Sequence, residues 1–170
     1  KAAVKSVNDD DLTQGNVSIT GGAVTLSAGS DGITALNELN ISGGRIVIDA
    51  LNEGLEARVL NLSGGELEIT AQDDGLNATD KRTDIDTDTG TDAETAADTE
   101  KNFRGGGKGK SHPQASIKIS GGVIRIDAEG DGVDSNGSFY MSGGELYVAG
   151  PSSGGDSALD YDGSCEISGG

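Results

Sequence analysis

The sequence has few of the residues that fill large cores or lock a chain covalently. It contains no tryptophan, three tyrosines, two phenylalanines and two prolines in 170 residues. So few large side chains predict a thin core built from small repeated units. The single cysteine, Cys165, excludes an intrachain disulfide. No apolar run approaches the roughly 20 residues of a transmembrane helix, and we expect no membrane insertion.

Positive charge is also scarce. The chain has 12 Lys and Arg against 29 Asp and Glu, which gives a formal net charge of −17. Nucleic acids and anionic membranes would repel such a chain, so we exclude them as partners. Metal cations or cationic surfaces are favoured instead. Acids scattered over a surface would serve solubility alone, whereas acids that cluster would favour a bound cation.

Glycine is abundant, with 29 residues, and part of it repeats. The string Ser/Thr-Gly-Gly recurs in steps of 21 or 22 residues, apart from one step of 57 and a last step of 26. Repeats of this length are typical of solenoids. The consensus motifs of leucine-rich repeats and of the calcium-binding nonapeptide roll are absent. The string stands at 20–22, 42–44, 63–65, 120–122, 142–144 and 168–170.

Apolar residues keep fixed distances from these glycine pairs. Leu67, Ile69 and Ala71 follow one pair at two-residue spacing, and other coils repeat the pattern. Alternation with a period of two is typical of strands with one buried face. We therefore predict an all-β fold, a right-handed parallel β-helix with three short strands per coil of about 21–22 residues; the handedness follows from the crossover rule. Cys165 falls in an apolar column and is expected to be buried.

The step of 57 residues contains an insertion. Residues 80–114 are rich in Asp, Thr, Gly and Lys and poor in apolar residues, which predicts a loop with little packing. We expect residues 1–170 to form a single β-helix domain with this low-complexity loop and with uncapped ends. Uncapped solenoid ends expose strand edges, so end-to-end stacking of subunits is a further hypothesis.

Acids recur at one corner of the predicted coil, nine and twelve residues past the glycine pair. Neighbouring coils would place them about 4.8 Å apart, where two unit charges repel by about 1 kcal/mol in water. Bound calcium would offset this repulsion, because it takes about six to eight oxygen ligands. The alternative is that Asp-Gly is ordinary turn chemistry. The predicted acidic ridge comprises Asp31, Glu53, Glu56, Asp73, Asp74, Asn77, Asp131 and Asp134, and alignment of the first partial coil adds Asp10.

Three segments resemble a known family. NEGLEARVLNLSGGELEITAQDDGLNAT, GDGVDSNGSFYMSGGELYVAGP and SALDYDGSCEISGG are similar to pectate-lyase-like β-helix proteins of clostridia described as carbohydrate-binding domain-containing. The resemblance covers most of 17–170 apart from the insertion. It implies a secreted or cell-surface bacterial protein that binds calcium and plant polysaccharides, including cellulose and acidic sugars, without established lyase action. The resemblance implies that the calcium ligands fall among the eight residues first named for the predicted ridge, Asp10 not included.

Three functions are compatible with these features. The leading hypothesis is an extracellular calcium-binding protein that binds polysaccharide. Outward-facing Tyr140 and Tyr147 would stack on sugar rings, while Lys118, Arg125 and Arg45 would pair with sugar carboxylates. The alternative is a structural surface filament or adhesin of stacked solenoids. A polysaccharide lyase would need a basic Arg or Lys beside the calcium, and Arg125 and Lys118 fall outside the acid-bearing corner.

Overall fold

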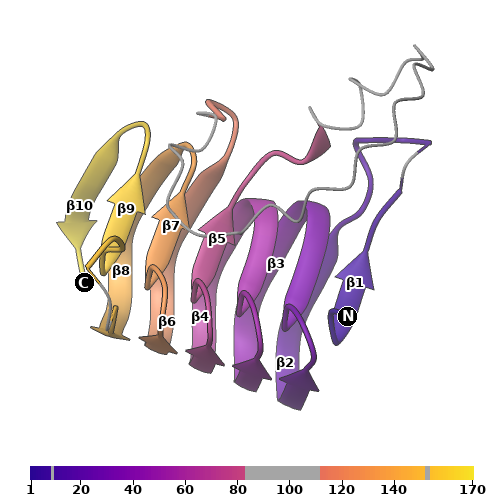
Figure 1. Cartoon of the computed structure of the whole chain (residues 1–170), viewed down its shortest axis with the longest axis horizontal. Helices are drawn as coiled ribbons and strands as arrows, with labels where there is room; N and C mark the ends of the chain where they lie inside the picture. Colours follow the sequence, from indigo (N-terminus) through magenta and orange to yellow (C-terminus); the bar gives the residue numbers. More distant parts are fainter. Residues whose placement is uncertain (9, 83–111, 152–153) are drawn as a thin grey trace, which may run out of the picture.

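The chain folds into a stack of parallel β-coils. The computed structural model describes residues 1–8, 10–82, 112–151 and 154–170, so most of the predicted insertion lies outside the described residues. Every strand pairing in the described part is parallel, and the coils lie side by side along the long axis (Figure 1). The stack is a β-solenoid of about five turns with coils of about 22 residues. The predicted all-β solenoid is thereby confirmed.

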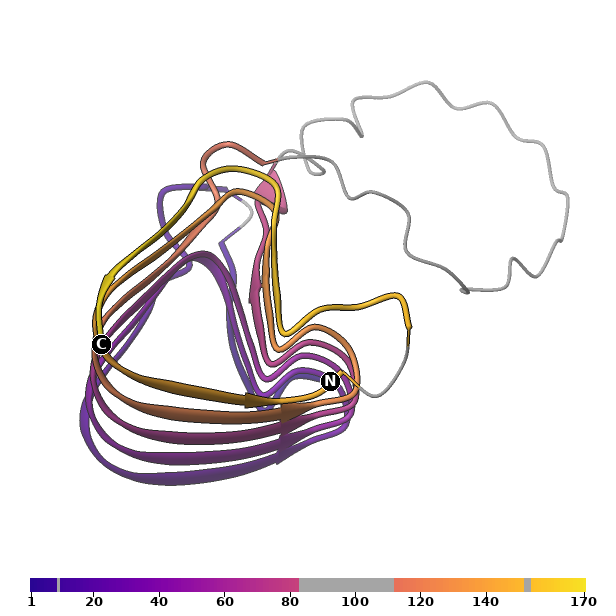
Figure 2. The ribbon, with the colours of Figure 1, turned by 90° about the vertical axis from the view of Figure 1, so that its left-hand side faces the viewer.

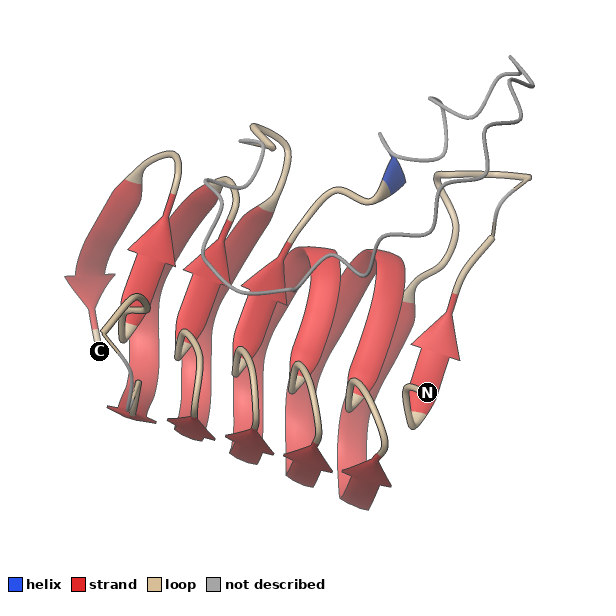
Figure 3. Cartoon of the chain, viewed as in Figure 1, coloured by secondary structure: helices blue, strands red, loops and turns tan. Residues whose placement is uncertain are grey.

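Ten strands form this sheet (Figure 3). Each long strand pairs with the long strand of the next coil, and the short strands β5, β7 and β9 continue one side of the stack. In the described residues, no helix is long and apolar enough to cross a membrane. The strands are β1 (Val4–Ser6), β2 (Val17–Ala28), β3 (Ile33–Ala50), β4 (Leu55–Ala71), β5 (Leu76–Ala78), β6 (Ser116–Ala128), β7 (Val133–Ser135), β8 (Ser138–Ala149), β9 (Leu159–Tyr161) and β10 (Cys165–Gly169).

The glycine pairs bend the coil without ending the strand. The second glycine of a pair has positive φ, +99° at Gly44 and +94° at Gly65, a conformation that side chains disfavour. β3 and β4 therefore continue through the bend, and the pairing register shifts beside it, between Ile41 and Ser42 in β3. The three predicted strands of a coil persist as ladder segments separated by such shifts. Viewed along the stack, the bends superpose from coil to coil (Figure 2).

The core consists of the predicted apolar columns. Leu67 pairs with Ile124 and Ile69 with Ile126, so the columns continue across the 57-residue step. These side chains are at most 3% exposed. Burial of each such side chain contributes about 1.5–3 kcal/mol, and stacking like residues supplies this term at every coil.

The prediction for Cys165 is wrong. Cys165 pairs in register with Phe139, as its column requires, yet it is exposed while Phe139 is fully buried. Two residues on, Ile167 is 62% exposed. The physical reason is that Phe139 is covered by coils on both sides, whereas β10 is the last strand of the sheet and pairs with β8 alone.

Candidate functional site

The acidic corner forms two columns along the stack. In the first column, the backbone N–H of the glycine in one coil donates to the backbone carbonyl of the acidic residue in the next coil. Gly32 donates to Glu53 at 2.8 Å and Gly54 to Asp74 at 2.8 Å. The parallel register builds the second, which runs through successive coils. The first column holds Asp31, Glu53, Asp74 and Asp131, and the second holds Thr34, Glu56, Asn77, Asp134 and Asp160.

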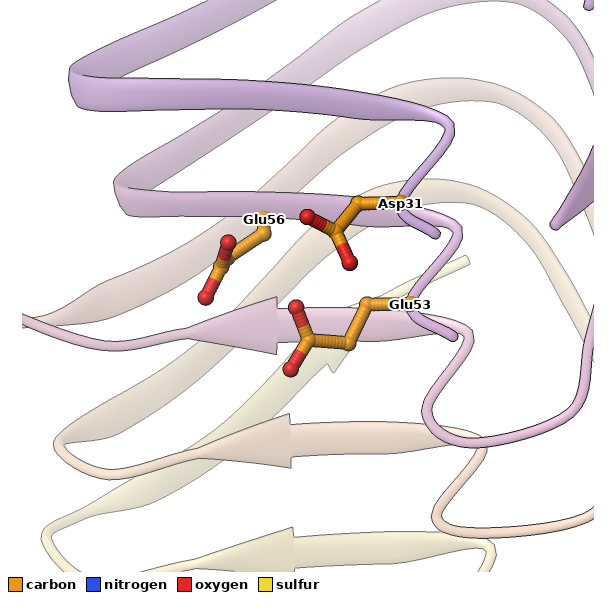
Figure 4. A group of neighbouring side chains, drawn as sticks. All are labelled: Asp31, Glu53 and Glu56. Atoms are coloured by element: carbon orange, nitrogen blue, oxygen red, sulfur yellow. The ribbon is translucent and has the colours of Figure 1, made fainter. Parts of the chain in front are cut away.

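Three carboxylates of these columns converge. One oxygen from each of Asp31, Glu53 and Glu56 lies within 4.8 Å of the others (Figure 4). Asp31 and Glu53 reach this point from successive turns, and Glu56 from the start of β4. Within the described part of the chain, this is the sole group of three or more His, Cys, Asp or Glu that meets so closely. We refer to Asp31, Glu53 and Glu56 as the carboxylate triad.

The triad presents oxygens that no hydrogen-bond donor satisfies. Glu56 is 1% exposed, and its Oε2 has no hydrogen-bond partner, like Glu53 Oε2 and Asn77 Oδ1. Asn77 lies beside the triad, because its Nδ2 donates to Glu53 Oε1 at 3.0 Å. Buried polar atoms are nearly always paired. Carboxylate and amide oxygens without donors fit a hard cation such as calcium.

Neighbouring polar groups hold the Asp31 carboxylate in place. Asn52 Nδ2 donates to Asp31 Oδ1 at 2.8 Å, and Thr34 Oγ1 donates to Asp31 Oδ2 at 3.1 Å. Desolvation alone would raise the pKa of Asp31, but these hydrogen bonds outweigh it and hold the pKa below its usual value. Asp31 therefore stays ionised and supplies a fixed negative charge.

Glu53 has the opposite electrostatic environment. Burial and the nearby Glu56 carboxylate raise the pKa of Glu53 to about 8. Without a bound cation, the triad therefore retains a proton near neutral pH. Binding of a divalent cation would release that proton, because the cation interacts more strongly with the ionised carboxylate than with the protonated acid.

Lys81 faces the triad and was missed at the sequence level. Its ammonium contacts Glu56 Oε1 directly. The residue belongs to the predicted low-complexity insertion 80–114, and it follows no repeat position that would have indicated contact with Glu56. The available signal was its place three residues after Ala78, where β5 ends, close to the second column.

The other predicted ridge acids do not join the triad. Asp74 Oδ1 accepts the N–H of Asp131 at 2.8 Å, and the Asp131 side chain accepts the N–H of Ser157. These two acids cap turns of the following coil, as the alternative interpretation of Asp-Gly expected. Asp73 and Asp134 flank them along the same corner.

Two ridge assignments change with the observed register. β1 pairs Val4 with Ile33, so the first coil begins earlier than the sequence alignment assumed. Asp10 is exposed in the turn after β1, where its N–H bonds Asn8 Oδ1, and the prediction that it joins the ridge is wrong. Asp160 extends the second column beyond Asp134 and was missed. Aligning ALDYDG with GVDSNG would have found it.

The predicted sugar-contacting residues form two pairs on the outer face. Arg125 and Tyr147 are neighbours on β6 and β8, with the guanidinium 4.6 Å from the ring centroid. They line a hollow of about 620 Å³ together with Glu68, Thr70 and Asp127. Such an arrangement combines an aromatic surface with hydrogen-bonding groups.

The second pair lies across the glycine bend from the first. Lys118 and Tyr140 pair across β6 and β8, and both are exposed. Arg45 instead forms ion pairs with Glu68 at 3.2 Å and with Glu66 at 3.7 Å, so acids of the same sheet already compensate its positive charge. Arg125 and Lys118 are therefore better placed than Arg45 to contact a sugar carboxylate.

In the absence of divalent cations, the free energy of unfolding should fall as the pH rises from about 5 to about 8. Burial first, and neighbouring carboxylates second, raise the pKa of Glu53 and Asp74 to about 8 and that of Asp134 to about 7. Carboxyls with raised pKa stabilise the fold below their unfolded pKa, and this contribution is lost as the pH passes the folded value. The lowered pKa of Asp31 acts in the opposite direction, but mainly below about pH 5.

Urea unfolding in EDTA at pH 5, 6.5 and 8 measures this slope, with an expected total loss on the order of a few kcal/mol. A divalent cation at the triad should remove only the share of Glu53 from this slope, because Asp74 and Asp134 lie outside the triad. Stability that is constant or rises with pH in EDTA would contradict the electrostatics described here.

Comparison with known proteins places this geometry in a family context. A family model described as "Carbohydrate-binding domain-containing protein" matches residues 1–81 and 51–157 of the chain. The matched ranges include the carboxylate triad and the Arg125–Tyr147 pair. No curated protein and no solved structure matches the chain.

Proposed function

Since the chain belongs to the family of carbohydrate-binding domain-containing proteins, we propose that it is an extracellular, calcium-dependent binder of acidic polysaccharide. The observation that supports this most is the carboxylate triad with its unsatisfied buried oxygens. Asp31, Glu53 and Glu56 would hold the ion, with Asn77 Oδ1 as a further oxygen. Calcium would offset most of the negative charge of the triad, and the ion itself would coordinate a carboxylate of an anionic sugar.

An acidic sugar suits this chain because the protein itself is strongly negative. Without a cation, the net charge of −17 would repel a uronate polymer. Calcium at the triad reduces this repulsion locally and offers a metal ion that a sugar carboxylate can coordinate, and an exposed guanidinium such as Arg125 supplies a positive charge. Tyr147, 51% exposed, offers a ring for sugar stacking beside that guanidinium.

We infer that this protein binds its polysaccharide without cleaving it. β-Elimination on a uronate needs an unprotonated base beside the metal. Lys81 is the basic side chain at the triad; desolvation lowers its pKa, but the hydrogen bond and charge of Glu56, with Glu53 and Asp31, raise it further. In the cation-free protein, its ammonium therefore keeps its proton. We expect no unsaturated product from polygalacturonate by ultraviolet absorbance, and appearance of that product with calcium would show a lyase.

A glycan-binding screen with and without EDTA tests the proposed function. Uronate-containing polysaccharides are expected to bind in calcium and to lose most of their affinity in EDTA. Cellulose oligosaccharides serve as the neutral comparison. Absence of binding to any glycan, with calcium present, would contradict the proposal.

Replacing Tyr147 is expected to weaken glycan binding. Tyr147→Ala removes the ring that lines the outer hollow and should reduce affinity about fivefold, in line with about 1 kcal/mol for an aromatic contact. Tyr147→Phe keeps the ring and loses only the hydroxyl bond to Glu145, so it should stay within about twofold of wild type.

Tyr161→Ala is the matched control, because Tyr161 is similarly exposed at 43% but lies on β9, outside the hollow. Binding is measured by calorimetry with the best glycan of the screen. Equal losses for Tyr147→Ala and Tyr161→Ala would argue against a role for the hollow.

A further inference from the structure

Lys81 already brings a positive charge to the carboxylate triad. Its ammonium contacts Glu56, and its charge also acts on Glu53 and Asp31. The Lys81 side chain is 53% exposed, whereas that of Glu56 is 2% exposed. A half-exposed lysine thus compensates the negative charge of a carboxylate that is buried away from water.

The backbone around Lys81 is fixed. Thr79 N–H donates to Ala57 O at 3.0 Å. Asp80 is buried; its N–H donates to His112 Nδ1 at 3.1 Å, and its carboxylate accepts from Arg82 Nε at 2.7 Å. Only the four-carbon stem of Lys81 needs to rotate for the ammonium to leave Glu56.

A cavity of about 200 Å³ adjoins the contact between Lys81 and Glu56. Its polar lining combines two ammonium groups, two hydroxyls and two members of the triad. An anionic group of a ligand could enter only where positive charge outweighs the carboxylates. The polar lining residues are Lys5, Asp31, Thr34, Glu56, Thr79 and Lys81.

We propose that Lys81 is a tethered counter-cation that a divalent cation displaces from Glu56, and that the displaced ammonium completes a subsite in this cavity for the carboxylate of an acidic sugar. The inference rests on the calcium site proposed above and adds an exchange between two cations.

Competition for the Glu56 carboxylate supports the exchange. Glu56 Oε1 contacts the Lys81 ammonium in the cation-free protein. A metal ion bound to the same carboxylate would repel that ammonium. Once displaced, Lys81 remains tethered beside the cavity, near Lys5. The ion at the triad and the two lysines then present positive charge to the same small space.

The exchange couples calcium to the sugar. Calcium frees the ammonium that binds the sugar carboxylate, so each ligand raises the affinity for the other by the same factor. A neutral sugar has no carboxylate for the Lys81 ammonium to pair with and is not coupled in this way.

Lys81→Gln separates the two roles of the lysine. EDTA-treated wild type, Lys81→Gln, Lys81→Arg and Lys1→Gln are titrated by calorimetry with calcium chloride, and then with a galacturonate trisaccharide in calcium or EDTA. Lys1→Gln is the matched control, because it also removes one exposed lysine. A cello-oligosaccharide is the neutral ligand.

Lys81→Gln is expected to bind calcium about tenfold more tightly than wild type, because no ammonium competes. Its unfolding temperature in EDTA should fall, since Glu56 loses its counter-charge. Its affinity for the galacturonate trisaccharide in calcium should be about tenfold weaker, with cello-oligosaccharide binding unchanged. Lys81→Arg and Lys1→Gln should resemble wild type.

The outcomes distinguish this inference from the proposed function. If wild type binds calcium and Lys81→Gln binds it equally, the exchange is wrong and the calcium site stands. If Lys81→Gln alone binds calcium, the exchange is supported and calcium dependence of the wild type fails. If neither protein binds calcium, both are overturned. An unchanged trisaccharide affinity in Lys81→Gln overturns the subsite.

Discussion

Calcium at about a hundred times its dissociation constant is expected to raise the unfolding temperature of the wild-type protein by about 8 °C and to leave Glu56→Gln nearly unchanged. Binding to the folded state alone contributes about 2.7 kcal/mol at that concentration, and each kcal/mol corresponds to about 2–4 °C in a domain of this size. Glu56 is the most buried ligand of the triad. Its amide would keep the shape but lose the charge that attracts the ion.

Asp10→Asn is the control for this experiment. It removes one acid that the structure places in an exposed turn, outside the ridge, so its calcium response should equal that of wild type. Differential scanning calorimetry in EDTA and in calcium measures all three proteins. A calcium-induced increase in Glu56→Gln as large as in wild type would exclude the triad as the site of that effect.

Gly54→Ala is expected to destabilise the protein by about 3 kcal/mol or more. A Cβ at Gly54 would lie 2.3 Å from Ile69 Cγ2 and 2.5 Å from the Gly75 carbonyl oxygen of the next coil. The side chain belongs to a packed column and the carbonyl to the backbone, so neither can move without disturbing the stack. The lack of space for a Cβ explains why glycine follows the acid in these turns. The acidic side chain points away from the core, and the glycine lets the next coil approach.

Gly21→Ala is the matched control, because a Cβ there meets nothing within 4 Å and its φ is not positive. It should change the free energy of unfolding by less than about 0.5 kcal/mol. Urea unfolding monitored by circular dichroism compares the two variants with wild type. Equal stabilities of Gly54→Ala and Gly21→Ala would contradict the close stacking at this corner.

The repeat made the fold predictable because each coil is templated by its neighbour. The spacing of Leu67 and Ile69 from their glycine pair is the spacing of Ile124 and Ile126 from the next, and the observed ladder joins these residues. A one-residue slip would turn the whole apolar set outward. The register therefore continues across the insertion, and the columns of acids follow it.

The sequence was less informative about residues whose position or burial depends on contacts outside the repeat pattern. Lys81 reaches Glu56 from outside the repeat, so no periodicity indicates their contact. Asp10 was misplaced because the first coil has few repeat positions to fix its alignment. Cys165 occupies the predicted column, but burial depends on coverage from both sides, which the column pattern does not encode.

Several predictions from sequence have no structural counterpart here. Residues 83–111 of the predicted insertion lie outside the described residues. End-to-end stacking into a filament and an extracellular location stay predictions, and analytical ultracentrifugation and cell fractionation address them separately.

Anomalous diffraction from crystals grown with calcium would show directly whether the carboxylate triad of this carbohydrate-binding solenoid is a cation site. We expect an anomalous peak about 2.3–2.6 Å from oxygens of Asp31, Glu53 and Glu56, with the Lys81 ammonium moved off Glu56. A triad without a peak at saturating calcium, with Lys81 still on Glu56, would contradict it.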